Sequence, residues 1–405
     1  MCGGAPWLHG ETACCWVVRF TVCRRAVAKM AWNFDRTGEV LLWAGVSGIV
    51  AMVLNTFGCS FSCYWVFLGC WMLSAGTVIT LSYIKVKPTG KAVIVTGCDH
   101  GIGNALAVHL HEQGFLVFAG CLNPHGEGAE ALRGLHSQRL IVLSMDVTRQ
   151  DQLDKAAQEV KRLLPQDEVV WGLVNNAGVT ARAHTEWVPL STYRRVVDIN
   201  LLGVIAATKA FLPLIRRGRG RVVNMSSVSG MMGAAMMSPY AATKYAVEGF
   251  SDCLRQEMKP WGVAVSLVEP ANFNAATRLV TEEGVAEEAE LMWATMEEVV
   301  RADYGKEYFD YVMKILQQTA FGGERDVTPV LTAVTEALTQ RFPRARYRVV
   351  NTYYFFKVAA AIHLPEWLCD RLPVPVAATV PAAMATPSSL SPVPTALRYT
   401  KQKKN

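Results

Sequence analysis

The stretch that decides the fold runs from Lys91 to Gly103 and reads KAVIVTGCDHGIG. Its first six residues are mostly β-branched and apolar, which is typical of a strand buried on both faces of a parallel sheet. Glycines follow at 97, 101 and 103, and an apolar helical pattern then continues to Gln113. Glycine allows a tight turn and lets the backbone approach a pyrophosphate, whose charge a helix N-terminus stabilises. The stretch therefore predicts the first strand and the nucleotide-binding turn of an α/β domain.

Similar apolar runs recur along the chain, and we expect strands at 92–96, 115–120, 141–145, 171–174, 221–225 and 263–268. Helical patterns separate these runs. The alternation predicts a single Rossmann-type, doubly wound parallel sheet with helices on both faces.

Polar residues follow two of the expected strands. Asp146 closes the third strand, and Asn175-Asn176-Ala177-Gly178 follows the fourth. Ligands bind at the carboxyl ends of strands in open parallel sheets, so both places are candidate contacts to a nucleotide. Taken alone, each has a simpler interpretation: Asp146 as a helix N-cap and the asparagine pair as a turn.

A serine, a tyrosine and a lysine indicate the chemistry. Tyr240 and Lys244 are four residues apart and share one helical face, and Ser227 follows the expected strand 221–225. Taking a hydride from a secondary alcohol requires a base for the hydroxyl proton, and tyrosine, with a reference pKa of about 10, needs nearby positive charge to act as one. We expect Lys244 and an oxidised nicotinamide ring to supply that charge and Ser227 to hold the substrate oxygen. A tyrosine and a lysine at this spacing are by themselves most often plain helix surface.

Together these motifs resemble the short-chain dehydrogenase/reductase family over about residues 90 to 300. The resemblance implies four catalytic residues, Ser227, Tyr240, Lys244 and Asn200, with Asn200 positioning a water in a proton relay from Lys244. Its alternative role is that of a polar residue that kinks a helix. The implied cofactor-binding residues are Gly97, Asp99, Gly101, Ile102, Gly103, Asn123, Asp146, Val147, Asn175, Ala177, Gly178, Tyr240, Lys244 and Pro270. No metal is implied.

Further segments resemble the branch of this family that oxidises 3-hydroxybutyrate in mitochondria. They lie at 114–122, 211–217, 250–255 and 303–306. This resemblance implies an enzyme that converts (R)-3-hydroxybutyrate to acetoacetate, reversibly. Membrane-bound retinol and 17β-hydroxysteroid dehydrogenases share many of the same features and remain alternatives. A nucleotide-binding membrane protein without catalysis ranks below them, because no catalytic position is lost.

The loop before the tyrosine bears on the substrate. Residues 231–237 contain four methionines, which suit a flexible apolar ligand or simple packing beneath a lid. A small carboxylate would instead need a cation to offset its desolvation. Arg182, His184 and Arg278 are the candidates for that cation, and each has the alternative of being an ordinary surface residue.

The choice between NAD and NADP is indicated by the absence of basic residues in the glycine turn and at the end of the second strand. A 2′-phosphate calls for lysine or arginine in the glycine turn or just after the second strand. The turn offers Asp99 and His100, and the second strand ends in Gly120-Cys121-Leu122-Asn123. We therefore predict NAD rather than NADP, with Asn123 hydrogen-bonding a ribose hydroxyl.

Two uncharged apolar stretches, about 40–57 and 64–84, precede the nucleotide turn. Each approaches or reaches the length of a bilayer core, so residues 39–87 predict a transmembrane hairpin, with a buried helical hairpin as the alternative. Basic residues before the first stretch and after the second predict that both ends lie on one side. Residues 1–38 are basic, compatible with a mitochondrial presequence or a cytoplasmic flank. The resemblance favours the mitochondrial inner membrane, with the endoplasmic reticulum second.

The rest of the chain divides into three parts. Residues 88–350 should form the dehydrogenase domain, with a helical lid over 273–310 in which Met292 and Trp293 either close the pocket or pack the lid down. Residues 351–372 are aromatic and apolar, which suits a membrane interface or a dimer surface in a homo-oligomer. Residues 373–405, dominated by proline, alanine, serine and threonine, predict a disordered tail.

Charge and cysteine usage narrow the class further. The formal net charge of +6 belongs to the two ends, because residues 91–372 carry 29 basic and 31 acidic residues. A nearly neutral body offers no basic face for nucleic acid, whereas basic ends suit anionic lipid headgroups. Seven of the eleven cysteines precede residue 71, without the spacing of a zinc site or a disulfide framework.

Overall fold

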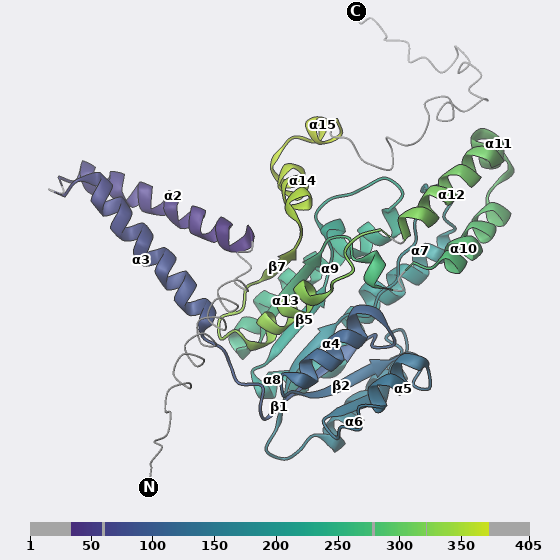
Figure 1. Cartoon of the computed structure of the whole chain (residues 1–405), viewed down its shortest axis with the longest axis horizontal. Helices are drawn as coiled ribbons and strands as arrows, with labels where there is room; N and C mark the ends of the chain where they lie inside the picture. The colour runs from purple at the N-terminus through teal and green to yellow at the C-terminus, as the bar shows by residue number, and fades with distance from the viewer. Residues whose placement is uncertain (1–33, 59–60, 278–279, 321, 372–405) are drawn as a thin grey trace, which may run out of the picture. The chain divides into compact units, whose positions relative to one another are not determined.

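The computed structural model describes residues 34–58, 61–277, 280–320 and 322–371 (Figure 1). The described residues fall into two compact units, which divide between Thr80 and Leu81.

The larger unit is built on a parallel sheet of seven strands in the order β3-β2-β1-β4-β5-β6-β7. This confirms the predicted doubly wound architecture. All six expected strands are present, and their ends differ from the expected ones by at most two residues. The strands are β1 (Lys91–Thr96), β2 (Leu116–Cys121), β3 (Leu140–Ser144), β4 (Val169–Asn175), β5 (Arg221–Met225), β6 (Ala264–Pro270) and β7 (Arg346–Val349).

Helices cover both faces of this sheet, because its strands are apolar on both sides (Figure 1). One face carries α4 (Gly101–Glu112), α5 (Glu127–Arg133) and α13 (Thr328–Thr339), which contribute Leu106, Leu132 and Val334 to one core. The other carries α6 (Gln150–Leu163), α8 (Gly203–Gly218) and α9 (Ser238–Met258), which contribute Leu153, Phe211 and Leu254 to a second core. The loops at the carboxyl ends of the strands thus stand on a rigid base.

Three further helices follow β6: α10 (Glu282–Thr295), α11 (Glu298–Tyr304) and α12 (Lys306–Ala320). They share an apolar cluster with Trp187, which precedes α7 (Leu190–Val197). Met292 is 1% exposed, and the Trp293 ring lies 5.0 Å from the Phe309 ring, centroid to centroid. These two side chains therefore pack α10 into the cluster it shares with α12, which agrees with the predicted alternative that they pack the lid down. Helix continues ten residues beyond the expected end at 310.

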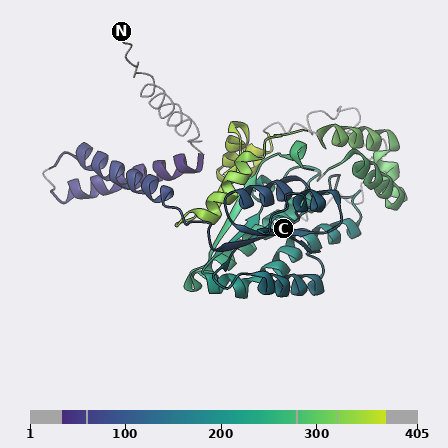
Figure 2. The same cartoon turned by 60° about the horizontal axis from the view of Figure 1, so that its bottom comes forward.

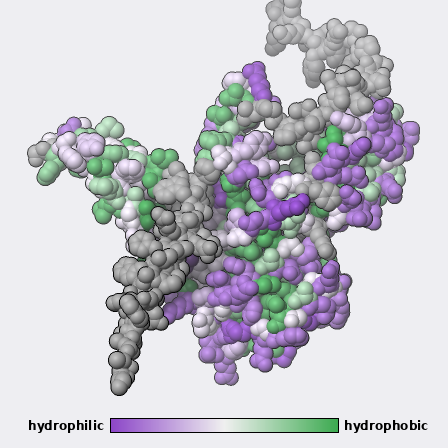
Figure 3. All heavy atoms as spheres, viewed as in Figure 1, coloured by the Kyte–Doolittle hydropathy of each residue, from purple (hydrophilic) through white to green (hydrophobic). Residues whose placement is uncertain are grey.

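The smaller unit contains two apolar helices, α2 (Phe34–Thr56) and α3 (Cys63–Tyr83), which lie side by side as a hairpin (Figure 2). The indole Nε1 of Trp71 donates a hydrogen bond to the Val40 carbonyl, 3.1 Å away. None of the described α3 residues is buried, and the surface of the hairpin is largely hydrophobic (Figure 3). By length and composition α3 is long and apolar enough to cross a membrane. The stretch Leu190–Gly218 passes the same test, but Phe211 and Ile215 pack it into the core beneath the sheet.

The described chain ends with α14 (Thr352–His363) and α15 (Glu366–Cys369). Large apolar side chains are exposed along this segment: Tyr353, Phe356, Ile362, Leu364 and Trp367. Val358 is buried, so one face of α14 packs inward while the aromatic face is uncovered. The predicted disordered tail and the N-terminal 33 residues lie outside the described residues.

Candidate active site

The glycine turn after β1 is pressed against the end of β4. Gly97 and Gly101 have positive φ angles of +70° and +60°, a conformation that L side chains rarely adopt. A Cβ on Gly103 would lie 2.1 Å from the Gly97 carbonyl oxygen, and one on Gly97 would lie 2.8 Å from the Ala177 Cα. A side chain at 97 would therefore force the turn away from Ala177, and one at 103 would collide with the Gly97 carbonyl inside the turn, so with glycine at both positions the backbone can line a cavity directly.

A cavity of about 210 Å³ opens beside this turn and the N-terminus of α4. Its walls come from the carboxyl ends of β1, β3 and β4, where nucleotides bind in sheets of this type. Nine of the predicted cofactor-binding residues line it: Gly97, Asp99, Gly101, Ile102, Gly103, Asp146, Val147, Ala177 and Gly178. The Asp146 carboxylate also accepts hydrogen bonds from the backbone and hydroxyl of Thr148, so it closes a turn as well.

Two predicted contacts lie elsewhere. Asn175 is 2% exposed, and its Nδ2 donates to Thr208 Oγ1 at 3.0 Å and Asn224 Oδ1 at 2.8 Å, which ties β4 to α8 and β5. The Asn123 side-chain oxygen accepts from the His125 amide at 3.1 Å and closes a local turn. Neither asparagine is among the described residues that line the cavity.

Asn176, which follows the predicted contact Asn175, does line the cavity. Its Nδ2 donates to the carbonyl oxygens of Thr96 at 3.0 Å and Gly97 at 3.1 Å, so it fixes the glycine turn. Sequence reasoning placed this residue in the correct turn but did not distinguish it from its neighbour. His100, Leu122, Met145, Val179, Ile199 and Thr277 complete the lining and were also not predicted as contacts.

A smaller cavity of about 90 Å³ brings together Ser227, Tyr240, Lys244 and Pro270. It shares Ile102, Asn176, Gly178 and Thr277 with the first cavity, so the two spaces adjoin. The Ser227 hydroxyl donates to the Pro270 carbonyl at 3.4 Å and is near enough to Tyr240 to oppose the rise in the pKa of the tyrosine. The Lys244 ammonium lies 5.5 Å from the centroid of the Tyr240 ring and donates to the Met225 carbonyl at 2.7 Å. Ser227 precedes Tyr240 by 13 residues and Lys244 follows it by four, and all three meet at one point beside the nucleotide cavity.

Local structure explains how these side chains converge. Strand β5 ends at Met225, and the Ser227 hydroxyl caps the short 3₁₀ turn that follows by accepting from the Ser229 amide at 3.2 Å. Helix α9 begins at Ser238 with a proline in its first turn, a position that suits proline because its missing N–H is not needed there. Tyr240 thus lies in the first turn of a rigid helix, with Lys244 one turn further on.

Burial dominates the electrostatics of this group. It raises the pKa of Tyr240 above 10, and the hydrogen bond with Ser227 and the positive charge of Arg182 offset this only in part. Burial also lowers the pKa of Lys244 from 10.5 to about 8, against the opposing charge of Glu248. In the protein by itself, the charge that lowers the pKa of Tyr240 in part is that of Arg182, and lowering by Lys244 together with an oxidised nicotinamide stays a prediction.

Asn200 lies in the π-helical turn Asp198–Leu202 that joins α7 to α8. It is fully buried: its Oδ1 accepts from the Val179 amide at 2.8 Å, and its Nδ2 donates to the Val179 carbonyl at 2.8 Å and to Thr243 Oγ1 at 3.1 Å. The helix is distorted at this point, as the structural alternative expects. The same amide also ties the end of the nucleotide cavity to α9, and such π turns are frequent at functional sites.

The three candidate cations for a substrate carboxylate have different surroundings. The His184 ring hydrogen-bonds the Tyr308 hydroxyl at 3.2 Å and packs edge-on against Trp187. Arg278 lies outside the described residues. Arg182 lines a third cavity, which shares Val179 with the nucleotide cavity.

Comparisons with known proteins agree with this arrangement. A family model described as short chain dehydrogenase matches residues 91–286. The chain is 46% identical over 293 residues to the mitochondrial D-beta-hydroxybutyrate dehydrogenase of Bos taurus, covering 71% of this chain and 85% of the relative. It is 39% identical to estradiol 17-beta-dehydrogenase 2 of Mus musculus, covering 69% and 73%. Among solved structures, a short-chain dehydrogenase from Streptomyces avermitilis superposes with a TM-score of 0.53 at 26% identity, covering 68% of this chain and 92% of that one.

Proposed function

Because this chain belongs to the short-chain dehydrogenase/reductase family, we propose that it is a membrane-anchored, NAD-dependent dehydrogenase that oxidises (R)-3-hydroxybutyrate to acetoacetate, reversibly. One observation carries the chemistry: Ser227, Tyr240 and Lys244 meet in a cavity that adjoins the nucleotide cavity. When bound, NAD supplies the hydride acceptor.

Each polar side chain then has a role. Tyr240 takes the hydroxyl proton of the alcohol, and the Ser227 hydroxyl holds the same oxygen by a hydrogen bond. Lys244 contributes positive charge beneath the tyrosine ring and a donor for a ribose hydroxyl. Asn200 positions a water between Lys244 and solvent. Burial alone raises the pKa of Tyr240, so the positive charge of the oxidised nicotinamide is needed to make its phenol an effective base.

The surroundings of Asp99 support NAD over NADP. Its carboxylate accepts hydrogen bonds from the backbone amides of Leu122 at 2.9 Å and Asn123 at 2.8 Å, at the end of β2. A 2′-phosphate at this place would face that negative charge. Among the described residues that line the nucleotide cavity there is no lysine or arginine to offset it.

The substrate space supports a small molecule. The cavity beside Arg182 measures about 160 Å³ and is smaller than the nucleotide cavity of about 210 Å³. In the methionine loop, Met236 is buried in the cluster around Trp187 and does not line any of these three cavities, so packing accounts for it. The identity to the steroid dehydrogenase of mouse keeps a 17β-hydroxysteroid, or a retinoid, as the second candidate.

A substrate assay tests this function directly. The full chain in lipid vesicles should oxidise (R)-3-hydroxybutyrate with a kcat/KM well above that for its (S) enantiomer, retinol or estradiol, and should prefer NAD to NADP by about tenfold or more. The reaction is followed by the absorbance of the reduced nucleotide. Faster turnover of estradiol or retinol would replace the proposed substrate, and a preference for NADP would reject the argument from Asp99.

We also propose that the α2–α3 hairpin anchors the enzyme in the membrane. Helix α3 has 21 residues, which at about 1.5 Å each match the roughly 30 Å of a bilayer core. Alkaline carbonate should therefore leave the protein in the membrane pellet, together with an integral marker protein. Complete extraction into the supernatant would contradict the anchor. The name of the bovine relative favours mitochondria over the endoplasmic reticulum, and cell fractionation distinguishes the two.

The exposed aromatic face of α14 supports a second contact with lipid. A dimer surface in a homo-oligomer is the other use for the same face.

A further inference from the structure

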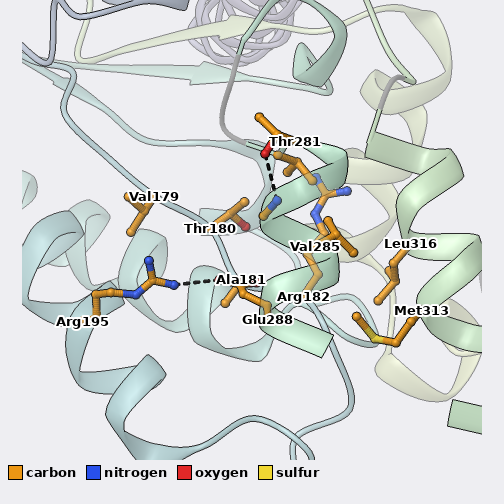
Figure 4. Close-up of a pocket in the computed structure, with 12 residues that line it drawn as sticks. Val179, Thr180, Ala181, Arg182, Arg195, Thr281, Val285, Glu288, Met313 and Leu316 are labelled. Carbon is orange, nitrogen blue, oxygen red and sulfur yellow. Dashed lines mark hydrogen bonds and ion pairs between the residues drawn. The ribbon is translucent and has the colours of Figure 1, made fainter. Parts of the chain in front are cut away.

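The cavity beside Arg182 lies between the segment that follows β4 and the helices α10 and α12 (Figure 4). Its charged side chains are Arg182, Arg195 and Glu288. Arg195 donates to the Glu288 carboxylate at 2.7 Å, and Figure 4 shows this pair on the opposite side of the segment from the Arg182 guanidinium. The Glu288 carboxylate is therefore already paired with Arg195, and the positive charge of Arg182 has no carboxylate partner in this cavity.

Arg182 is the unusual member of the set. Its Nε is buried without a hydrogen-bond partner, and no described carboxylate forms an ion pair with it. The hydroxyl of Thr180, which lines the same cavity, is also buried without a partner. Arg182 as a whole is half-buried, but leaving its buried Nε without an acceptor is costly, and this favours an anion that is supplied from outside. Two unpaired donors on one cavity define where that anion would bind.

Arg182 lies in the segment that leads away from the reacting group, because Gly178 lines the cavity of Tyr240 and Val179 lines the cavity of Arg182. Its positive charge reaches Tyr240 strongly enough to lower the pKa of the tyrosine in part. Among the other lining residues, the Thr281 hydroxyl is taken up in capping α10, and Val280, Val285, Met313 and Leu316 form an apolar wall. The cavity therefore suits the carboxylate and the small alkyl group of a short molecule whose hydroxyl reaches the neighbouring cavity that Tyr240 lines.

We propose that Arg182, assisted by the Thr180 hydroxyl, binds the substrate carboxylate and selects 3-hydroxy acids over neutral alcohols. The proposal rests on the proposed function and names the residue that determines its substrate class. The guanidinium fork matches a carboxylate in geometry and charge. Val285, Met313 and Leu316 then receive the alkyl end of the acid.

The test compares (R)-3-hydroxybutyrate with its uncharged methyl ester in the full-length protein. In Arg182→Leu, the ratio of kcat/KM for the acid to that for the ester should fall about thirtyfold or more, because a buried carboxylate loses its charged partner. Any effect of the substitution through Tyr240 changes both substrates equally and leaves the ratio unchanged. Arg194→Leu, at an exposed arginine of α7, is the control and should leave the ratio as in the wild type.

An unchanged ratio in Arg182→Leu would overturn the inference while leaving the proposed function intact. A wild-type protein that does not oxidise (R)-3-hydroxybutyrate would instead reject the proposed function, and the inference with it. Should Arg182→Leu fail to fold, Arg182→Lys keeps the charge but loses the planar fork, and its ratio should fall by a smaller factor. A ratio equal to that of the wild type in a folded Arg182→Lys protein would also count against a bidentate contact.

Discussion

Replacing Tyr240 with phenylalanine is expected to lower kcat/KM for alcohol oxidation by roughly a thousandfold, because proton transfer by a positioned side chain contributes about 10² to 10⁴ to the rate. The substitution removes one oxygen atom. The ring remains in the first turn of α9, and the Lys244 ammonium, 5.5 Å from the ring centroid, keeps its contact with the aromatic face. Binding of NAD should therefore change by less than about threefold.

Steady-state kinetics and a fluorescence titration with reduced nucleotide measure the two effects separately. The control is Tyr245→Phe, which removes the same atom from a tyrosine that is 46% exposed on the same helix and should leave both quantities as in the wild type. Near-normal turnover in Tyr240→Phe would mean that another group takes the proton. Loss of nucleotide binding together with activity would mean that the hydroxyl is needed to build the site.

The sheet could be predicted because parallel strands covered on both faces leave continuous apolar runs in the sequence. Strand β7 has no such run. It reads Arg346-Tyr347-Arg348-Val349, and its arginines pair with Glu248, Asp252 and Glu269, which lie 77 to 98 residues away in the chain. An alternation of charged and apolar residues whose partners are so distant resembles a surface segment, so local sequence could not reveal the seventh strand.

At the site, too, features fixed by local sequence could be predicted, whereas features that depend on distant segments could not. Ser227, Tyr240 and Lys244 could be named because helical spacing fixes two of them and a strand end fixes the third. Asn175 and Asn176 are adjacent, and which of them faces the nucleotide cavity depends on how the end of β4 is oriented, a property that composition does not encode. From the sequence, Arg182 had the alternative of being an ordinary surface residue, because its partial enclosure involves helices α10 and α12, which line the same cavity more than 100 residues further along the chain.

The direction of the tyrosine pKa is the clearest case of a property that sequence could not give. Charge partners can be counted from spacing, but desolvation depends on how completely other elements enclose a group. Both Tyr240 and Lys244 are enclosed, so burial raises one pKa and lowers the other. Without a bound nucleotide, burial therefore favours the neutral form of each group. Keeping Lys244 charged at neutral pH then lowers the free energy of unfolding.

Lys244→Met is accordingly expected to abolish activity without destabilising the domain. Burial lowers the pKa of Lys244 from 10.5 to about 8, so holding the ammonium charged at neutral pH costs on the order of 3 kcal/mol. Methionine fills similar space without this cost, although the Met225 carbonyl then loses its donor, a penalty of about 1 to 3 kcal/mol. The free energy of unfolding at pH 7 should therefore be equal to or above that of the wild type, while kcat/KM falls roughly a thousandfold.

The pH dependence of unfolding identifies the cause. Between pH 8 and about 10.5 the unfolded chain holds a proton on Lys244 that the folded protein has released, so the wild type gains stability relative to Lys244→Met as the pH rises through this range. Denaturant titrations at several pH values measure the difference, and Lys209→Met, at an exposed lysine of α8, should show none of it. A variant that is inactive and also markedly less stable at pH 7 would show that Lys244 holds the fold together. Retained stability with lost turnover would show that the domain keeps a charged lysine in its interior for its chemistry, at a cost to folding.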